Sequence, residues 1–504
     1  MEKIFEVIGL EGAYQKILFQ INLFTGVLTC IYLLQIPYLT KHPSFYVQKL
    51  KSEVPNTIYE MEYSPELCNM TLYSISKNPK KSIINWSYTF YLYCERESYN
   101  TILTSIIFIG GILGSLFILP LPDKYGRAIL KYIALVSLIL HLNLLCIVGP
   151  IHIIFINFMG GMISQIFPIG YALFIEFFPK NKNGILVGIL NAVYSLTGVL
   201  FCLFFLFANN WRLLFLITSV IHSYYTYITI KYFIESPRWL HSIGNEEGCI
   251  SAITEVAFFN DRIQQWNDFQ KNNPDIINKL GTTFLEKEGE KNINNKNNNN
   301  KTYNLFHILQ FKSQRATFIK MISISVVCAY NYYGIILNLG KMKGNFYLNS
   351  IFAFLGEFTA EIISGKLADK FGRIKIFTLS CLIGTIGYIL YLISPYFKFL
   401  FVFLAMMGYS GTFNVMAIYI PEIFPTKIRN ITFAYISLLS RLSPICVPIL
   451  TQVMPNIIDY TFILCGIIYG LIGITLEETL GKKILDIIPE EEEENENIKM
   501  QLIN

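Results

Sequence analysis

The chain has 504 residues, of which 53% are hydrophobic and only 15% are charged. Soluble domains carry roughly 25% charged residues, so this composition excludes an ordinary soluble protein. The formal net charge of +5 is too small to indicate a nucleic-acid partner. Because the apolar residues come in long uncharged runs, such as 101–122 and 184–210, we expect an integral membrane protein.

Twelve runs are apolar and long enough to cross a bilayer as helices, which takes about 20 residues. They lie near 15–38, 101–122, 129–149, 151–178, 184–208, 212–233, 317–339, 346–368, 376–394, 398–425, 430–453 and 458–477. The first run is too long for the core of a cleavable signal, and Glu2, Glu6 and Glu11 stand where such a signal has basic residues. We therefore expect this run to form the first span.

The spans divide the chain into two halves with three polar segments. The predicted organisation is an N-terminal segment (1–14), a six-helix half (15–233) with a large outer loop (39–100), a connecting loop (234–315), a second six-helix half (316–480) and an acidic tail (481–504). The first part of the connecting loop is predicted to be helical and amphipathic. Its asparagine tract, 291–301, is of low complexity and is expected to be disordered.

The basic residues of the short loops are unevenly distributed. The loops after spans 2, 4, 8 and 10 carry Lys124, Arg127, Lys131, Lys180, Lys182, Lys370, Arg373, Lys375, Lys427 and Arg429. The positive-inside rule places these loops and both termini in the cytosol of a multi-pass protein, for which we expect the plasma membrane. Lys341, Lys343 and Lys398 lie in loops on the opposite side and weakly oppose this orientation.

An internal repeat relates the two halves. Asp123–Arg127 (DKYGR) follows span 2 and Asp369–Arg373 (DKFGR) follows span 8, so the two motifs are 246 residues apart. Glu176 and Glu422, at the ends of spans 4 and 10, are also 246 residues apart. Glu235 and Glu478 follow spans 6 and 12 at a separation of 243 residues. Three matches in register predict two parallel six-span repeats, as in transporters whose halves rock about a central site.

The repeated acids and bases are predicted to form a charge network that holds a cytosolic gate shut. Its candidate members are Asp123, Arg127, Glu176, Glu235, Arg238, Asp369, Arg373, Glu422, Arg429 and Glu478. Gly126 and Gly372 supply a backbone conformation that the tight turns between spans require. The alternative is that the basic residues are only topological anchors. The repetition of the acids favours the gate.

These motifs resemble those of the major facilitator superfamily, in which the doubled loop is a signature. Several stretches resemble its organic cation/anion/carnitine transporter family in particular. They are Gly12–Gln15 (GAYQ), Phe90–Glu95 (FYLYCE), Glu235–Leu240 (ESPRWL), Tyr332–Gly334 (YYG), Gly344–Leu348 (GNFYL), Glu357–Phe358 (EF) and Glu422–Asn430 (EIFPTKIRN). The resemblance covers nearly the whole chain. It implies an all-α membrane protein with twelve transmembrane helices in two parallel six-helix repeats, the major facilitator fold.

The first-half loop departs from the family pattern. The family has a glycine four residues before the loop aspartate, where this chain has Leu119, followed by Pro120 and Pro122. The second half keeps the corresponding Gly365. The departure concerns the details of the first-half gate and leaves the predicted fold unchanged.

Two ionisable side chains inside spans indicate a substrate site, because such residues are costly in a bilayer. Arg441 lies in the middle of span 11, and Glu357 lies in span 8 with Glu361 one helical turn further. In the resembled family the position matching Arg441 is aspartate in cation carriers and arginine in anion and carnitine carriers. A guanidinium binds both oxygens of a carboxylate, so we expect an anionic or zwitterionic substrate. The alternative is a structural Arg441 that pairs with Glu357 or a backbone carbonyl.

The resemblance implies further residues on the wall of the same cavity. They are Asn191 and Tyr194 of span 5, Tyr332 of span 7, Phe413 and Asn414 of span 10, and Phe167 of span 4. Aromatic walls with a few amides suit amphipathic ions of varied shape. For each aromatic residue the alternative is ordinary packing, since the chain has 40 Phe and 32 Tyr.

Cys68 and Cys94 share the outer loop, where an oxidising environment permits a disulfide, and we expect them to be bonded to each other. No cysteine or histidine spacing indicates a metal site, and no motif indicates a nucleotide, another cofactor or an enzymatic nucleophile.

The sequence thus predicts a monomeric transporter of small organic ions that works by alternating access and prefers anions or carnitine-like zwitterions. An organic cation carrier and a sugar porter are the alternatives within transport. A nutrient sensor that does not transport, with the cytosolic loop and tail as signalling elements, is the alternative from a different class.

Overall fold

The computed structural model describes residues 2–9, 12–49, 58–69, 73–178, 183–273, 309 and 312–481. The predicted asparagine tract and all of the acidic tail after Gly481 lie outside the described residues.

Twelve helical segments follow the twelve predicted spans. In the first half they are α2 (Ala13–Leu33) with α3 (Ile36–Thr40), α5 (Glu97–Phe117), α7 (Ile129–Asn143), α8 (Pro150–Ile163) with α9 (Ile166–Glu176), α10 (Asn183–Phe207) and α11 (Trp211–Tyr232). In the second half they are α17 (Lys312–Asn338), α18 (Phe346–Phe371), α19 (Arg373–Ile393), α20 (Lys398–Ile423), α21 (Thr426–Ser440) with α22 (Ser443–Val453), and α23 (Ile458–Ile474). In the described part of the chain, eleven segments are long and apolar enough to cross a membrane, and the apolar α23 has 17 residues.

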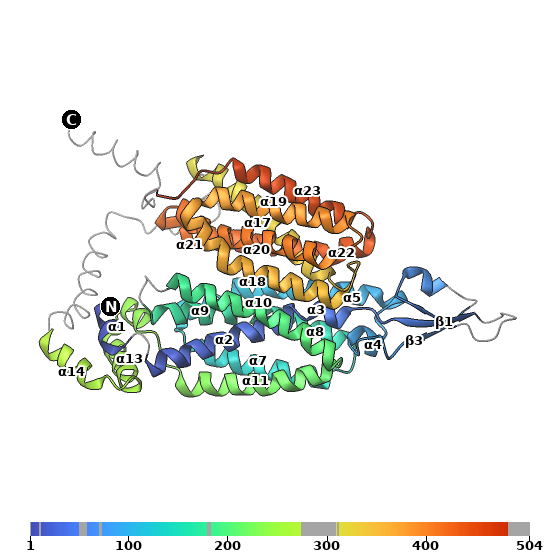
Figure 1. Ribbon diagram of the computed structural model, residues 1–504. Coiled ribbons are helices and arrows are strands. Elements are labelled where there is room, and N and C mark those ends of the chain that lie inside the picture. The colour runs from blue at the N-terminus through green and yellow to red at the C-terminus, as the bar shows by residue number, and fades with distance from the viewer. Residues whose placement is uncertain are drawn as a thin grey trace.

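The two halves lie side by side along their length. In Figure 1 the first half, coloured blue to green, forms the lower layer of helices, and the second half, yellow to red, forms the upper layer. The helices of both layers run roughly parallel to one long axis.

A small β-sheet lies at one end of the bundle, which we call the sheet end. Its strands are β1 (Phe45–Lys49), β2 (Ile58–Met61) and β3 (Tyr73–Lys77), in the antiparallel order β2-β1-β3. The side chains of Phe45 and Val47, on β1, are buried and pack with Leu67 in a small apolar cluster. The short helices η1 (Pro65–Asn69), α4 (Trp86–Phe90) and η2 (Cys94–Arg96) complete this segment. The sequence predicted only a large loop here.

The opposite end, which we call the motif end, carries both DK[YF]GR loops. The short helices at this end are α1 (Glu2–Ile8), α6 (Leu121–Tyr125), α12 (Pro237–Ser242), α13 (Glu246–Phe259) and α14 (Ile263–Asn272). Asn260 joins several of them, because its side chain accepts from the Tyr14 N–H at 3.0 Å and donates to the Ile8 carbonyl at 2.9 Å. The connecting loop therefore begins as helices packed on the first half (Figure 1).

Several spans are broken near a proline, and two of these breaks lie beside candidate functional residues. In the first half the chain bends between α5 and α6, at Pro120 and Pro122, whereas α18 continues without a break to Phe371. Span 11 is divided between α21 and α22 at Arg441, three residues before Pro444. Proline removes a backbone donor and clashes with the preceding turn, which explains both breaks.

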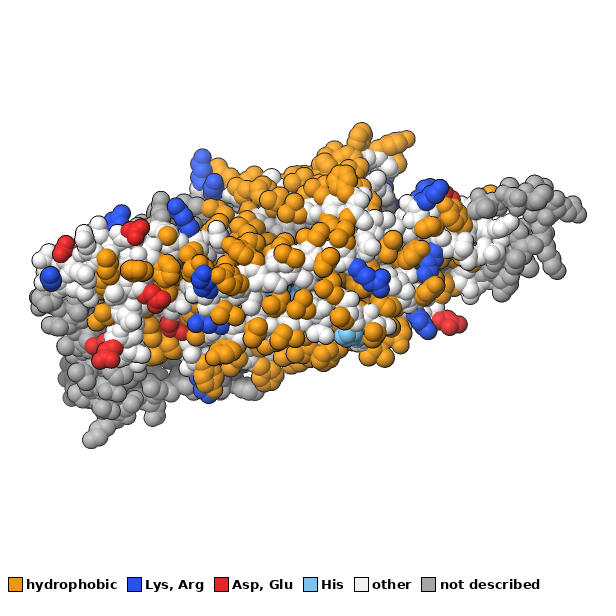
Figure 2. All heavy atoms as spheres, turned by 90° about the horizontal axis from the view of Figure 1, so that it is seen from below, with side chains coloured by type: hydrophobic (Ala, Val, Ile, Leu, Met, Phe, Trp, Pro, Cys, Tyr) orange, Lys and Arg blue, Asp and Glu red, His pale blue; other side chains and the backbone are white. Residues whose placement is uncertain are grey.

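The outer surface of the bundle has the polarity of a membrane protein. Figure 2 shows hydrophobic side chains over the middle of one face and charged side chains toward its two ends. Large apolar side chains exposed on α7, α8 and α11 include Tyr132, Ile151, Phe155 and Val220. An exposed apolar surface of this extent is stable in lipid and would aggregate in water.

The contacts found between the halves lie near the sheet end or in the middle of the bundle. Hydrogen bonds join Thr101 to Gln452 (2.6 Å), Ser105 to the Ile445 carbonyl (3.1 Å) and Cys202 to the Tyr347 carbonyl (3.4 Å). Toward the motif end, the Asn191 amide of α10 donates to Glu361 Oε2 of α18 at 3.4 Å. The halves are thus held together at the sheet end.

Candidate functional site

The first repeated loop forms a compact charge network. The Arg127 guanidinium donates from Nε and Nη2 to the two carboxylate oxygens of Glu176, at 3.1 and 2.7 Å. Its Nη1 lies 3.0 Å from Asp123 Oδ1. Glu235 accepts from the backbone N–H groups of Arg127 and Ala128, both at 3.0 Å. This network binds the ends of spans 2, 3, 4 and 6 to one another.

The second loop repeats this arrangement with nearly the same geometry. Arg373 donates from Nε and Nη2 to the two oxygens of Glu422, at 3.1 and 2.9 Å, and its Nη2 lies 2.9 Å from Asp369 Oδ1. Glu478 accepts from the backbone N–H groups of Arg373 and Ile374, at 2.8 and 3.1 Å. The structure therefore brings together eight of the ten predicted gate residues, four in each half.

Glycine makes room for the glutamate that caps each loop. Gly126 and Gly372 have φ of +90° and +108°, a region that side chains rarely adopt. A Cβ at Gly372 would lie 2.6 Å from Glu478 Oε2, and a Cβ at Gly126 would lie 2.7 Å from Glu235 Oε2. Burial opposes ionisation of Glu478, but the four backbone N–H groups that donate to it outweigh burial and hold its pKa below the ordinary value.

Each network closes within its own half of the molecule. In this conformation the paired residues join the ends of spans in one half, so a role as a gate between the halves stays a prediction. Arg238 lies beside the first network, where it donates to the Phe178 carbonyl at 2.9 Å and its guanidinium lies over the Phe5 ring at 5.2 Å. The side chain of Arg429, the remaining predicted member, lies outside the described residues.

The predicted substrate site lies in the middle of the bundle, where Glu357 is only 3% exposed. The Tyr332 hydroxyl donates to Glu357 Oε1 at 2.5 Å. Among the described residues no hydrogen bond within 3.5 Å reaches Glu357 Oε2, and the Ser195 hydroxyl is a neighbouring donor that interacts with this carboxylate. The Tyr332 ring stacks on Phe413 with 5.9 Å between centroids. A buried carboxylate oxygen without a partner is costly, so this group is available to a ligand.

Arg441 lies at the break between α21 and α22. Within the described part of the chain, neither a hydrogen bond nor an ion pair involves its guanidinium. The predicted alternative, a pair with Glu357 or a backbone carbonyl, is therefore not present in this conformation. Its Nη1 faces Gly111 of α5, where an added Cβ would lie 3.0 Å away. Tyr194 and Tyr333 lie near both Arg441 and Glu357, and so connect the surroundings of the base and the acid.

The other predicted wall residues lie around these groups. Phe167 and Tyr194 approach with 6.4 Å between ring centroids. Asn191 donates to Glu361, and Asn414 donates to the Ser364 hydroxyl at 2.9 Å. All eight predicted substrate residues therefore come from helices that meet in the middle of the bundle.

Sequence reasoning did not single out three residues that border the candidate site. Tyr333 lies 5.1 Å from Phe108 of the other half between ring centroids, Gly111 faces Arg441, and Glu361 bonds to Asn191 across the halves. The sequence held a signal only for Glu361, which is charged within a span. Tyr333 and Gly111 are ordinary residues whose position depends on how the two halves pack.

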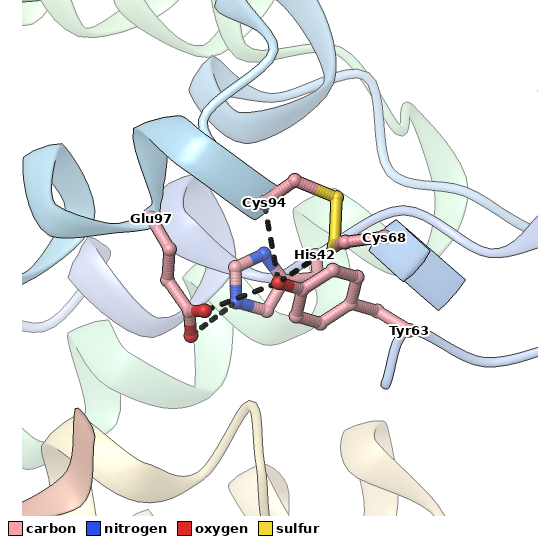
Figure 3. The surroundings of a disulfide bond; sticks show 5 residues. All are labelled: His42, Tyr63, Cys68, Cys94 and Glu97. Carbon is pink, nitrogen blue, oxygen red and sulfur yellow. Dashed lines mark hydrogen bonds and ion pairs between the residues drawn. A yellow bond between two sulfur atoms is a disulfide. The ribbon is translucent and has the colours of Figure 1, made fainter. Parts of the chain in front are cut away.

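The sheet end contains a second polar cluster, drawn in Figure 3. A disulfide joins Cys68 and Cys94. The Tyr63 hydroxyl accepts from the Cys94 N–H at 3.2 Å and donates to Glu97 Oε2 at 3.1 Å. His42 Nε2 lies 3.7 Å from Glu97 Oε1. The disulfide therefore holds a tyrosine that orients the carboxylate at the start of α5.

Glu97 connects this cluster to the second half. Lys341, in the loop between α17 and α18, places its Nζ 3.8 Å from Glu97 Oε1. Burial outweighs the nearby Glu97 and lowers the pKa of His42, so the imidazole is neutral at pH 7. Lys341 is then the cation that pairs with Glu97 across the halves.

A family model described as the Major Facilitator Superfamily matches residues 82–339 and 316–497. The xylose transporter XylE from E. coli, in its inward-open conformation, has the same fold, with a TM-score of 0.63 at 14% identity over 93% of this chain and 97% of that chain. At this identity the structural likeness concerns the fold alone.

Several relatives align with the chain. Organic cation/carnitine transporter 4 of Arabidopsis thaliana is 27% identical over 55% of this chain and 51% of its own length. Solute carrier family 22 member 6 of Pseudopleuronectes americanus is 24% identical over 82% of this chain and 72% of its own length. An organic cation transporter-like protein of Drosophila melanogaster is 22% identical over 96% of this chain and 91% of its own length.

The first of these alignments spans about half the length of the relative, whereas the other two span most of theirs. Together with the paired loop networks and the twelve helical segments, the matches identify the class of protein. The chain belongs to the major facilitator superfamily, is similar to transporters of the solute carrier family 22 type, and is a membrane transporter and not an enzyme.

Proposed function

We propose that the protein carries small organic ions across the plasma membrane by alternating access, with a preference for anions or carnitine-like zwitterions. The observation that carries this proposal is the unpaired Arg441 between the two halves. A guanidinium in a bilayer is costly, by about 3 kcal/mol on insertion scales, and requires a partner. A substrate carboxylate is a partner of matching geometry, because the planar fork donates to both of its oxygens.

The break in span 11 places two helix ends beside Arg441, the C-terminus of α21 at Ser440 and the N-terminus of α22 at Ser443. These ends carry partial charges of opposite sign, which offset each other at the arginine. The positive potential of this region therefore comes from the guanidinium itself.

Glu357 extends the preference from anions to zwitterions. Its unpartnered Oε2 attracts a cationic group, and Tyr194 and Tyr333 lie near both it and Arg441. A molecule with a carboxylate at one end and an ammonium at the other pairs with both side chains. Tyr332 and Phe413 offer ring faces, and a quaternary ammonium is attracted to such faces.

The orientation of the protein in the membrane determines which side this conformation opens to. If the motif end is cytosolic, as the distribution of basic loops indicates, the contacts near the sheet end close the outer side. The described molecule then faces inward, with each cytosolic charge network closed inside its own half. Both termini are cytosolic in this orientation, and the carrier works as a monomer.

Charge selectivity tests the proposal. We expect Arg441→Gln to weaken anion binding by at least about 1.5 kcal/mol, or about tenfold, the low end for a charged hydrogen bond. Arg441→Asp should depress anion uptake further and leave or raise cation uptake. The measurement is competitive uptake of benzoate, L-carnitine and tetraethylammonium into vesicles that contain wild type or either variant.

The same charge preference in all three proteins would make Arg441 structural and end the proposed substrate class. Lys366→Gln is the matched control, because it removes a positive charge from the motif-end part of α18.

Uptake above equilibrium into vesicles that contain only this protein excludes a pure sensor. An organic cation carrier is the second candidate, favoured by the free oxygen of Glu357, and preferred uptake of tetraethylammonium by wild type would support it.

A further inference from the structure

Glu361 is a buried ionisable group that the proposed substrate site does not use. It lies one turn beyond Glu357 on α18, on the side of the motif end, and residues four apart on a helix are neighbours. Glu357 is 3% exposed, whereas Glu361 is partly accessible. The two carboxylates thus form a short series from the interior of the bundle toward the motif end.

Neither carboxylate has a basic partner. Among the described residues, the ion pairs formed by lysine, arginine or histidine involve neither Glu357 nor Glu361. The hydroxyls of Tyr332 and Ser195 that interact with Glu357 are neutral, so they do not compensate its charge. Two carboxylates one helical turn apart in a buried site are not both stable as anions, because each disfavours the charge on the other. The pair therefore requires a positive charge that the described side chains do not supply.

The other ionisable groups near the pair cannot neutralise it. Those that face it are Cys30 from α2, Tyr194 from α10, and Tyr332 and Tyr333 from α17, while α20 contributes the amide Asn414. All of these side chains are neutral or carry negative charge when they ionise. The ionisable neighbours of Arg441 in this region are Tyr194 and Tyr333, and neither carboxylate is among them.

The ionisable side chains in the middle of the bundle have one positive charge fewer than they need for neutrality. Glu357, Glu361 and Arg441 sum to one negative charge when all three are ionised. A bound zwitterion adds no net charge, because its carboxylate pairs with Arg441 and its cation with Glu357. One proton on Glu361 completes the balance, so that every charge in the loaded site is compensated.

We infer that Glu361 is a proton site and that the protein couples substrate movement to a proton. When the site opens to the sheet-end side, the Glu361 carboxylate takes up one proton and becomes a carboxylic acid. When the site opens to the motif end, this acid releases the proton and becomes a carboxylate again. No other bond forms or breaks, and the proton crosses in the same direction as the substrate.

The contact across the halves explains how the charge on Glu361 affects the conformation. The Asn191 amide of the first half donates to Glu361 Oε2 in the state closed at the sheet end. A donated N–H favours an ionised acceptor over a protonated one. This state therefore favours release of the proton, and protonation weakens the one described hydrogen bond that joins α10 to α18 at this level.

The proton site is tested first without any substrate. Infrared titration of purified full-length protein detects a protonated buried carboxyl by its C=O stretch. We expect a band that titrates in wild type, is lost in Glu361→Gln, and persists with a shifted midpoint in Glu361→Asp. Asp459→Asn is the matched control, because Asp459 is a carboxylate near the sheet end that accepts from Tyr388 and should not alter the band. A wild-type spectrum without a band that depends on Glu361 would overturn the inference.

Coupling is tested in proteoliposomes with L-carnitine as the probe. With the membrane potential clamped at zero, because one positive charge crosses with each neutral zwitterion, an outside-acid gradient of one pH unit should drive accumulation in wild type toward about tenfold, the limit for one proton per substrate. Glu361→Gln should reach only equilibrium, yet still exchange labelled for unlabelled probe. Accumulation by Glu361→Gln, or accumulation in wild type that follows sodium and not pH, would refute the coupling.

This inference rests on the proposed transport function and extends it to the driving ion. The experiments distinguish a failure of the substrate preference from a failure of the proton site. If wild type exchanges no L-carnitine, the zwitterion preference fails while the infrared band still decides on the proton site. If exchange is normal and neither the band nor the gradient depends on Glu361, the proton site fails and the substrate preference stands.

Discussion

At the scale of the residue, one arginine in each half determines the local structure. Arg373 donates to both oxygens of Glu422, to Asp369 and to the Ala368 carbonyl, at 2.9–3.1 Å. Arg127 makes the same set of contacts in the first half. These contacts require a planar fork with several donors, which lysine lacks.

We expect Arg373→Ala and Asp369→Asn to reduce transport by at least about tenfold while the protein still reaches the membrane, because the first leaves Glu422 and Asp369 without their base and the second removes one of the two acids that hold Arg373. Arg373→Lys should recover little, since an ammonium cannot bind Glu422 with two parallel hydrogen bonds. The measurement is the initial uptake rate divided by surface-labelled protein. Lys375→Ala is the control, because Lys375 is a basic residue of the same loop but is exposed.

If Lys375→Ala reduced transport as much as Arg373→Ala, the loop would be a topological anchor that needs only positive charge. Wild-type flux in both Arg373→Ala and Asp369→Asn would remove the gate interpretation altogether.

The sequence predicted the members of these networks but not their pairing. Three acid and base positions recur in register, and this repeat identified Glu176 and Glu235 with Arg127 without any structure. Whether a network closes within one half or across both depends on how the halves tilt. That tilt changes during transport while the residues stay the same.

At the scale of the element, hydropathy located all twelve spans but not their breaks. Span 4 is divided between α8 and α9 at Ser164 and Gln165, and span 11 is divided at Arg441. Hydropathy averages over about 19 residues and does not detect backbone geometry. Pro168 and Pro444, each just after a break, were the local signals.

The sheet at the sheet end was not predicted, because its strands have only four or five residues each. Its core consists of Phe45, Val47 and Leu67 with a few partly buried neighbours. A core this small seldom supports a fold without a covalent link, and the disulfide supplies one. The expectation that Cys68 pairs with Cys94 came from their shared compartment and not from any strand pattern.

We expect a peptide map made without reductant to show Cys68 and Cys94 in one linked pair of peptides. Replacing both with serine should loosen this segment by about 3 kcal/mol, because the loop they close has a sequence separation of 26. Hydrogen exchange in β1 and β3 should then accelerate while exchange in α17–α20 stays unchanged. Two free thiols in the map, or unchanged exchange in the double variant, would contradict the structural role of the bond.

At the scale of the whole molecule, the contacts divide into those that persist and those that must break. The charge networks join spans within each half and allow each half to move as one body. The contacts at the sheet end join the halves and must open for the other side to become accessible. One of them is electrostatic, between Glu97 of the first half and Lys341 of the second, and Lys41 lies over the Phe346 ring beside it at 4.2 Å.

Reversing that ion pair should shift the equilibrium between the two conformations. The side chains of Lys341 and Glu97 are 47% and 21% exposed, so the pair contributes about 0.5–1 kcal/mol to closure of the sheet end. Lys341→Glu replaces this attraction with repulsion and should raise the population open at the sheet end about fivefold or more. Combining it with Glu97→Lys restores opposite charges and should return most of the closed population.

Distance measurements between spin labels at the exposed positions Lys80 and Asn456, one in each half, report this population directly. The labels require a background without the exposed thiols Cys146 and Cys446. Neither label position is Glu97 or Lys341, so labelling leaves both residues of the ion pair in place. Lys343→Glu is the control, since it makes the same charge reversal two residues from Lys341. An equal shift in Lys343→Glu, or no recovery in the charge-swapped double variant, would show that net charge at the sheet end, and not this pair, controls closure.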